Sequence, residues 1–242
     1  MEINQTSSQY GEIDHCIWAL LAEIHKKYNL EMASSVYRRG FGLINLNDKR
    51  IEDIKELSIK LEKISGWKLA AVEGLISERS FFGLLTRKIY PITIYIRKLE
   101  EIEFSEQPDI FHDIYGHVPL LANRKFCDFL SNIARVATRN IDNEIAISYL
   151  ARLYWYTFEM GLIKEDAVVK PYGGAIITSK AEINRVQDST VTKEFLDVVQ
   201  VFKTPYDPYK LQTKYFYINS FDDLFDLNEK LEANLNECLK NI

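Results

Sequence analysis

Two of the four histidines of this 242-residue chain lie close together. His112 and His117 are five residues apart, which on a regular α-helix turns their side chains about 140° away from each other. The imidazoles can therefore converge on one ion only if the helix ends between them, and Gly116 and Pro119 are residue types at which helices end. The spacing also differs from the HExxH motif of zinc proteases. The pair is a candidate for a different kind of metal site.

Glu159 is a candidate third ligand. It interrupts a stretch of apolar residues, 144–163, that predicts one helix with almost no polar face and hence a place in the core. On that helix Trp155, Leu162 and Ile163 would share its face. An ionised carboxylate in such surroundings is costly unless it meets a metal, a cation or several donors. The alternative is a buried salt bridge, with Arg152 or with a base distant in the sequence.

Two imidazoles and one carboxylate from separate helices suit an iron(II) site that leaves positions open for oxygen or substrate. Zinc in a hydrolase is the chemical alternative, because two histidines and a glutamate also bind zinc. The other two histidines, His15 and His25, lie on a predicted amphipathic helix and are expected to be surface or structural residues.

The elements that must position these residues are mainly helices. Apolar stripes at helical spacing predict helices over 17–24, over 51–64 with an end at Gly66, and over 126–136 with a turn near Asn140. Alternation predicts short strands over 92–96, just before Arg97, and over 212–219, and a polar-faced helix runs from about residue 220 to the end. We find no repeat, low-complexity tract or linker. The prediction is one domain, 1–242, mainly α with a few short strands and a flexible N-terminus over 1–13.

Composition limits the partners. The formal net charge of −5 does not attract polyphosphate, so nucleic acid is not an expected partner. The aromatic content of 12% is explained first by a thick core. Three cysteines without CxxC spacing indicate free thiols in an intracellular protein. No signal peptide is visible and no apolar stretch reaches the ~18–20 residues of a membrane span, so the expected compartment is the cytoplasm and no membrane partner is expected.

The residues around these candidates resemble a known family. Segments 108–121 (PDIFHDIYGHVPLL) and 154–162 (YWYTFEMGL), with Arg97 fifteen residues before His112, are similar to those of the biopterin-dependent aromatic amino acid hydroxylases, and most of all to the short bacterial phenylalanine hydroxylases. The resemblance extends from about Asp14 to the last helix. It includes Gly66-Trp67-Lys68-Leu69, Phe81-Phe82, Tyr172-Gly173-Gly174 and Thr204-Pro205-Tyr206.

The resemblance implies the catalytic-domain fold of that family and an iron(II) ion held by His112, His117 and Glu159. It also implies a tetrahydropterin, either tetrahydrobiopterin or a bacterial analogue, which supplies electrons while O₂ is used to hydroxylate the ring of a free aromatic amino acid. The expected reaction is L-phenylalanine to L-tyrosine, as in phenylalanine 4-monooxygenase. By the same match the pterin lies against Phe81, and Asp113 bonds it directly or through water, unless Asp113 only supports the neighbouring ligand.

Five residues match substrate positions of the family. Arg97 matches the residue that grips the substrate carboxylate with two parallel hydrogen bonds, and without the resemblance it would pass for a surface arginine. Ser105 falls where the family has a threonine near the same carboxylate. Pro108 and Trp155 match positions that hold the substrate ring, and Thr178 replaces a serine that helps to order the site. Trp155 favours phenylalanine over tryptophan, because tryptophan hydroxylases carry phenylalanine there.

The glycine-rich segment departs from the family pattern Tyr-Gly-Ala-Gly. Here it reads Tyr172-Gly173-Gly174-Ala175, so Ala175 adds a methyl group that could tighten the pocket. The animal enzymes' regulatory region and long tetramerisation helix find no counterpart, and a monomer is expected. Two alternatives remain: a tailoring hydroxylase that acts at another ring position or on another aromatic amino acid, and a metal-binding homologue without activity. The intact ligand set and Arg97 argue against the second.

Overall fold

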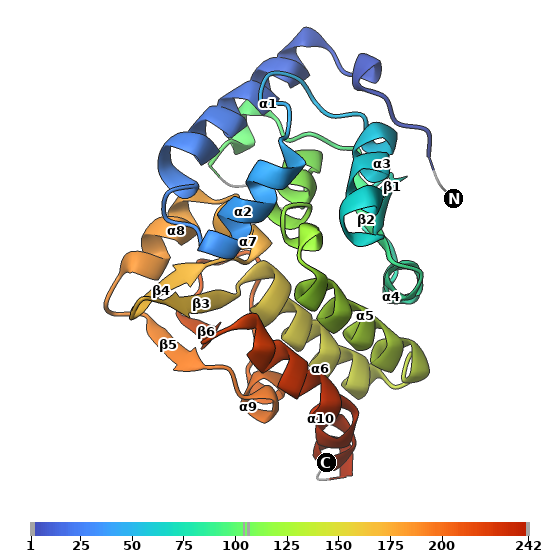
Figure 1. The fold of residues 1–242 in the computed structure, drawn as a ribbon, viewed down its shortest axis with the longest axis vertical. Helices are drawn as coiled ribbons and strands as arrows, with labels where there is room; N and C mark the ends of the chain where they lie inside the picture. The colour runs from blue at the N-terminus through green and yellow to red at the C-terminus, as the bar shows by residue number, and fades with distance from the viewer. Residues whose placement is uncertain (1–2, 104, 106, 241–242) are drawn as a thin grey trace.

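The computed structural model describes residues 3–103, 105 and 107–240, so residues 1–2 and 241–242 of the predicted domain lie outside the described part. Helices dominate it, with a few short strands, as predicted (Figure 1). The regular helices are α1 (Glu12–Ile24), α2 (Ser35–Ile44), α3 (Ile54–Ser65), α4 (Glu78–Thr86), α5 (Arg124–Arg139), α6 (Glu144–Tyr154), α7 (Gly174–Ile177), α8 (Lys180–Gln187), α9 (Val198–Lys203) and α10 (Phe221–Lys240).

Shorter helical turns connect these elements. Three are π-helices, in which residue i bonds to i+5: η2 (His25–Asn29), η4 (His112–His117) and η6 (Trp155–Glu159). Three are 3₁₀ turns: η1 (Ser7–Gln9), η3 (Leu99–Glu101) and η5 (Leu120–Ala122). Two of the π-helices contain the candidate metal ligands, and π-turns of this kind are frequent at functional sites.

The helix ends follow from local residue chemistry. Side-chain oxygens of the residues before α2, α4, α5, α6 and α8 accept hydrogen bonds from backbone N–H groups in the first turn. Helix α3 ends at Gly66, whose φ of 79° is left-handed and therefore suits glycine, as the sequence predicts. In the segment for which flexibility is expected, Gln5 is buried, and its Oε1 accepts a hydrogen bond from the N–H of Ile54 at the start of α3.

The predicted helix over 144–163 is wrong at its second half. Helix α6 ends at Tyr154 and continues as the wider π-helix η6, and Leu162 already belongs to strand β3. After η6 the chain turns at Gly161, where only glycine fits, because a Cβ there would lie 2.2 Å from the carbonyl oxygen of Thr157. The carbonyl of Gly161 accepts the N–H groups of Tyr172 and Gly173, just before α7. Leu162 and Ile163 therefore do not share a helix face with Glu159.

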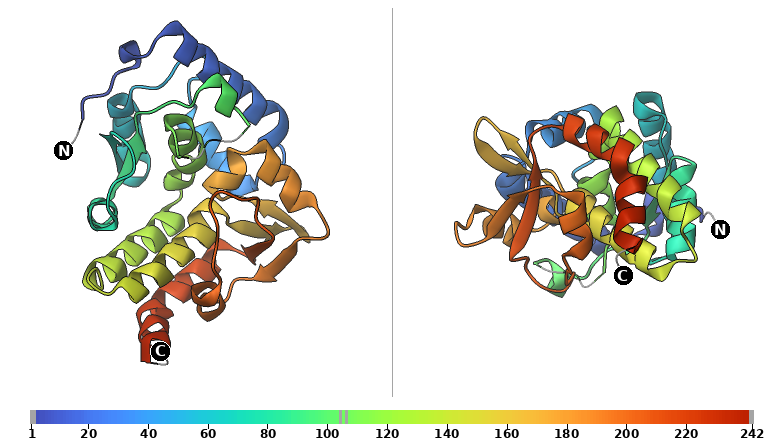
Figure 2. Two further views of the ribbon diagram at one scale, coloured as in Figure 1. Left: turned by 180° about the vertical axis from the view of Figure 1, so that it is seen from behind. Right: turned by 90° about the horizontal axis from the view of Figure 1, so that it is seen from below.

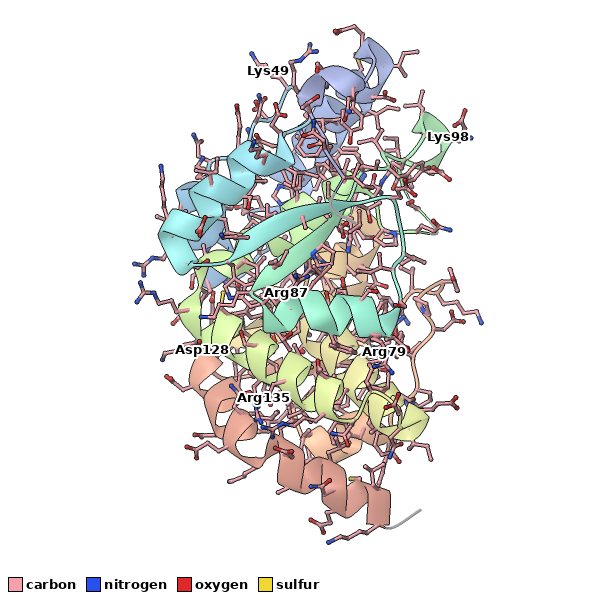
Figure 3. The ribbon with its side chains drawn as sticks, turned by 90° about the vertical axis from the view of Figure 1, so that its right-hand side faces the viewer. Lys49, Arg79, Arg87, Lys98, Asp128 and Arg135 are labelled. Atoms are coloured by element: carbon pink, nitrogen blue, oxygen red, sulfur yellow. The ribbon has the colours of Figure 1, made fainter. Side chains whose placement is uncertain are left out.

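Two small sheets flank the helices. Strands β1 (Lys68–Val72) and β2 (Ile89–Thr93) pair in parallel, and β3 (Leu162–Glu165), β4 (Val168–Pro171), β5 (Thr192–Phe195) and β6 (Lys214–Ile218) form a sheet of order β4-β3-β6-β5. The strand predicted up to Ile96 stops earlier, at Thr93, so Arg97 lies in the connection after β2 rather than at its end. Figure 3 shows α4 between the β1–β2 pair and α5, with Arg79 and Arg87 near its two ends.

The helices α5, α6 and α10 pack side by side at one end of the molecule, and α1 lies at the other (Figures 1 and 2). Leu224, Leu231 and Leu235 of α10 are fully buried, as are Phe129, Leu130 and Ile133 of α5. Within the described residues, no helix is both long enough and apolar enough to cross a membrane.

Candidate metal centre and substrate cavity

The two histidines converge because the helix that carries them is wider than an α-helix. The prediction that the helix must end between them is wrong: η4 runs unbroken from His112 to His117. In a π-helix residues five apart come nearly into line, so the two imidazoles lie on the same side. Their Nε2 atoms are 3.2 Å apart and their rings are almost perpendicular, at 83°. Gly116 lies between them, where a Cβ would come within 2.9 Å of the Cα of Gly174.

Glu159, the last residue of η6, completes the group. Its Oε1 lies 3.2 Å from Nε2 of His117 and its Oε2 lies 3.4 Å from Nε2 of His112. Metal–ligand bonds of about 2.1 Å at right angles place neighbouring ligand atoms about 3.0 Å apart. The separation of the two Nε2 atoms and the two imidazole–carboxylate contacts are all close to that length. The carboxylate meets each imidazole through a different oxygen, so the two imidazoles and the carboxylate can approach one ion from the same side. They are also the group of possible metal ligands found in the described residues.

The unpartnered atoms of the centre agree with this fit. Glu159 Oε2 and His117 Nδ1 are buried and have no hydrogen-bond partner among the described residues. Burial alone would raise the pKa of Glu159, but His117 and His112 lower it well below its ordinary value, so the carboxylate is ionised. The salt bridge with Arg152 considered from sequence is not formed, since that guanidinium donates to the carbonyl of Phe202. A divalent cation would satisfy this carboxylate.

Thr178 fixes the orientation of His112. Its hydroxyl donates to the carbonyl of Gly174 at 2.8 Å and lies 2.9 Å from His112 Nδ1. Because the hydroxyl hydrogen is already used, the Nδ1–H of His112 donates to Thr178, and Nε2 keeps its lone pair for a metal. Gly174 is tightly placed as well, since a Cβ there would lie 2.5 Å from Cε1 of His117. Thr178, predicted to order the site, thus contacts the candidate ligand His112.

A cavity of about 470 Å³ lies beside the centre, and His112 and Glu159 form part of its wall. It brings together all five residues predicted to bind substrate. Its lining includes Arg97, Ser105, Pro108, Trp155, Met160, Ala175, Thr178, Tyr209 and Leu211. Its size suits a small organic molecule such as an amino acid.

Arg97 is buried, not exposed, and is held by a residue that sequence reasoning missed. Its Nε and Nη2 donate to the two carboxylate oxygens of Asp109 at 2.8 and 2.9 Å. Asp109 also accepts the backbone N–H of His112. Burial alone would raise the pKa of Asp109, but Arg97 lowers it below its ordinary value. One carboxylate thus fixes both the cavity arginine and the start of η4, and its position three residues before His112 was the available signal.

Trp155 forms part of the cavity wall, and a second aromatic ring packs against it. Its ring stacks on Tyr206, with centroids 4.5 Å apart and planes 13° apart. Tyr206 was recognised from sequence as part of a family segment, but its contact with Trp155 joins residues 51 positions apart and left no sequence signal. Ser105 also lines the cavity, and its hydroxyl donates to the carbonyl of Gln107 at 2.7 Å.

The two residues predicted to bind pterin, Phe81 and Asp113, do not line this cavity. Phe81 is half-buried and makes edge contacts with Tyr90 and Tyr154, and Tyr90 in turn packs on the ring of His117 at 5.1 Å. Asp113 is buried and accepts the N–H of Thr93 at 2.7 Å. Burial raises its pKa above the ordinary value. A row of aromatic rings therefore links Phe81 to the metal centre, beside a carboxylate.

The remaining histidines are buried, so of the two expected positions, surface or structural, the structural one is confirmed. His15 is buried and its Nδ1 accepts the N–H of Ile51. His25 is buried beside Tyr37. A second, larger hollow of about 940 Å³ runs along β1 and α4, but it contains none of the candidate residues.

Comparison with known proteins agrees with this centre. The sequence profile of the family described as biopterin-dependent aromatic amino acid hydroxylase matches residues 4–240. The phenylalanine-4-hydroxylases of Vibrio cholerae and Chromobacterium violaceum are 33% and 35% identical to the chain. The matches cover 92% of the chain in both cases, and 78% and 75% of those proteins.

Solved structures give the same result. The phenylalanine hydroxylase of Chromobacterium violaceum bound to cobalt superposes with a TM-score of 0.94 at 32% identity, over 99% of this chain and 87% of that one. The same enzyme with bound iron(III) and 7,8-dihydrobiopterin gives a TM-score of 0.92 at 34% identity, over 99% and 86%. The chain described here belongs to the family of biopterin-dependent aromatic amino acid hydroxylases.

Proposed function

We propose that His112, His117 and Glu159 bind iron(II), and that the chain hydroxylates the ring of L-phenylalanine to give L-tyrosine. The observation that carries the proposal is the convergence of two Nε2 atoms, 3.2 Å apart, on the two oxygens of one carboxylate at 3.2 and 3.4 Å, on the wall of a cavity sized for an amino acid. The facial arrangement leaves the other side of the ion open, as an iron(II) oxygenase requires. The names and ligands of the similar proteins support the choice of iron over zinc.

The cavity residues have separate roles in this proposal. Arg97 binds the substrate carboxylate with the part of its guanidinium that Asp109 does not use, and within the described residues no hydrogen bond engages Nη1. Ser105 lies near the same carboxylate. Trp155 and Pro108 hold the aromatic ring, and the stacked Tyr206 keeps Trp155 in place. The fixed arginine and the rigid wall would orient the ring toward the metal and exclude water.

We place the tetrahydropterin against Phe81, near Asp113, on the side of the centre reached through Tyr90 and Tyr154. Phe81 offers a partly exposed aromatic ring and Asp113 a hydrogen-bond acceptor, which fits a flat heterocycle that carries N–H groups. The pterin supplies the reducing electrons when bound, together with iron and O₂. The chain's own contribution is to hold His112 and His117 rigidly beside it.

The test is a reaction with defined components. Protein freed of metal is loaded with iron(II) without oxygen, and a tetrahydropterin, O₂ and each aromatic amino acid are then added. We expect tyrosine from phenylalanine, in amounts that depend on iron and pterin. Turnover with zinc in place of iron, or without a pterin, would contradict the proposal.

One feature of the cavity favours an alternative function, hydroxylation at another position of the ring. Ala175 lines the cavity, where the family pattern has glycine, and its methyl group narrows the space around the substrate. The same reaction mixtures therefore need chromatographic separation of 4-hydroxyphenylalanine from its 2- and 3-isomers. A majority of either other isomer would make the chain a tailoring hydroxylase.

We also propose that the enzyme is a single catalytic domain that acts as a monomer in the cytoplasm. Helix α10 buries Leu224, Leu231 and Leu235 in its own chain, so this stripe is not free for a coiled coil. Cys16, Cys127 and Cys238 are free thiols, which suits a reducing compartment. Light scattering at working concentration tests the monomer, and an increase in mass with concentration would contradict it.

A further inference from the structure

The π-helix that contains no candidate metal ligand, η2, has two polar residues buried deep in the protein. His25 and Asn29 are its first and last residues, and each is only 1% exposed. Polar side chains are costly to bury unless their hydrogen bonds are made. Their partners, Tyr37 and Ile177, connect them to the surroundings of the ligand histidines, although η2 is more than 80 residues from either histidine in sequence.

Asn29 reaches the segment behind His112. Its Nδ2 donates to the carbonyl of Ile177 at 2.8 Å, across 148 residues of sequence. Ile177 ends α7, and the next residue is Thr178, whose hydroxyl accepts from Nδ1 of His112. Asn29 therefore fixes the backbone from which Thr178 orients the ligand.

His25 reaches η4 through Tyr37. The hydroxyl of Tyr37 donates to the carbonyl of Tyr115 at 2.6 Å, and Tyr115 lies in η4 between the two ligand histidines. That hydroxyl has one hydrogen, so the 2.9 Å contact with His25 must be a donation from Nε2–H of His25 to the oxygen of Tyr37. Burial lowers the pKa of His25 to about 3, so the imidazole is neutral, as this arrangement requires.

We propose that His25, Asn29 and Tyr37 form a metal brace, which positions both imidazole ligands by holding the carbonyls of Tyr115 and Ile177. The proposal rests on the ligand set proposed above. None of the three touches the metal or the substrate cavity, so they are positioning residues. Their effect passes through η4 to His112 and His117, and through Thr178 to His112 alone.

A purely structural role is the competing explanation, and it makes a different prediction. The rings of His25, Tyr37 and Tyr115 also pack together, with centroids 5.1–5.8 Å apart for the two His25 pairs. Packing depends on the rings, whereas the brace depends on the Tyr37 hydroxyl and the Asn29 amide. Tyr37→Phe removes the hydroxyl and keeps the ring.

The experiment measures cobalt(II) binding to metal-free protein, with the visible spectrum of the ion as a direct report of ligand geometry. For Tyr37→Phe and for Asn29→Ala we expect affinity about 10-fold weaker than wild type, in the range found for residues that support metal ligands, and an altered spectrum. The matched control is Tyr172→Phe, which removes a buried hydroxyl that has no partner among the described residues. We expect the control to keep wild-type affinity and spectrum.

Two outcomes would overturn the brace. One is wild-type cobalt affinity and spectrum in Asn29→Ala and in Tyr37→Phe. The other is a fall in thermal stability of both variants with no change in the affinity of the folded protein, which indicates packing alone. His112→Ala separates the two proposals: it should lose cobalt, and if it binds cobalt like wild type, the ligand set itself is wrong and the brace falls with it.

Discussion

Helices α5 and α10 pack mainly through apolar side chains, with one part-buried amide contact between Asn132 and Asn228, whereas η4 and η6 bury two imidazoles and a carboxylate. In the first region burial itself is favourable, and the charged groups, such as Arg139 and Glu232, meet at the surface. In the second region, burial alone would disfavour the charged form of Glu159. Two buried polar atoms of this region, Glu159 Oε2 and His117 Nδ1, have no hydrogen-bond partner among the described residues. The packing of the helix pair needs no bound ion. The candidate centre has buried polar atoms that a bound ion would satisfy.

The largest expected effect is therefore loss of the metal without loss of the fold. Glu159→Ala should abolish stoichiometric iron(II) binding and hydroxylation, because it removes one of only three proposed protein ligands. The metal-free variant should stay folded but lose some stability at neutral pH, because His117 and His112 hold the pKa of Glu159 below its ordinary value and so favour the ionised carboxylate in the folded state. Metal analysis and thermal unfolding of the metal-free protein measure the two effects. Full iron content in this variant would remove η6 from the site.

Asp109→Asn tests the second region through stability, because it breaks a buried ion pair that also supports η4. Leaving Arg97 buried and unpaired should lower the free energy of unfolding by about 3–5 kcal/mol at neutral pH. The folded pKa of Asp109 is lowered, so its stabilisation is present above the unfolded value of about 3.9 and is lost as pH falls through the folded pKa. The difference between variant and wild type, measured by urea unfolding, should shrink below about pH 4. A difference independent of pH would assign the effect to packing.

Leu231→Ala is the counterpart in the helix pair. It should lower the free energy of unfolding by about 2–5 kcal/mol through the lost burial and the cavity left behind. Cobalt(II) affinity of the folded variant should equal that of wild type, because α10 contributes no atom to the metal centre. Weaker cobalt binding here would mean that the two regions are coupled, and the contrast between them would not hold.

The same contrast explains what the sequence could predict. Helices α3 and α5 were predictable because their apolar residues recur at helical spacing, and Gly66 marks an end. The candidate ligands were predicted because His112, His117 and Glu159 match the motifs of the family; from the residues alone, zinc and a buried salt bridge stayed open. The π-form of η4 was not, since a widened turn leaves no periodic pattern in six residues. The end of α6 at Tyr154 was missed because the apolar run continues through η6, and the glycine, Gly161, comes only after η6.

Partners distant in sequence were beyond reach for a different reason. Asn29 and Ile177 are 148 residues apart, and nothing in either segment indicates the other. The contact of Trp155 with Tyr206 is of the same kind. Asp109 was closer to prediction, because it precedes His112 by three residues, but its bond to Arg97 depends on the connection after β2. Tertiary structure, not local propensity, makes these pairs.

The smallest expected effect concerns substrate choice, where the cavity wall is changed and neither region is broken. We expect wild type to prefer phenylalanine over tryptophan, because Trp155 occupies volume that an indole would need and its stack on Tyr206 prevents it from moving aside. Trp155→Phe should raise kcat/KM for tryptophan relative to phenylalanine by about 10-fold, the scale of one to two methylene groups in a pocket. Competition between the two amino acids at equal concentration measures it, with Tyr206→Phe, which keeps the stacking ring, as control. Tyrosine is less well excluded, since an apolar pocket rejects an added hydroxyl only about 100-fold. A wild type that prefers tryptophan would overturn the predicted preference. If Trp155→Phe binds iron like wild type but shows no relative gain for tryptophan, the steric explanation is refuted.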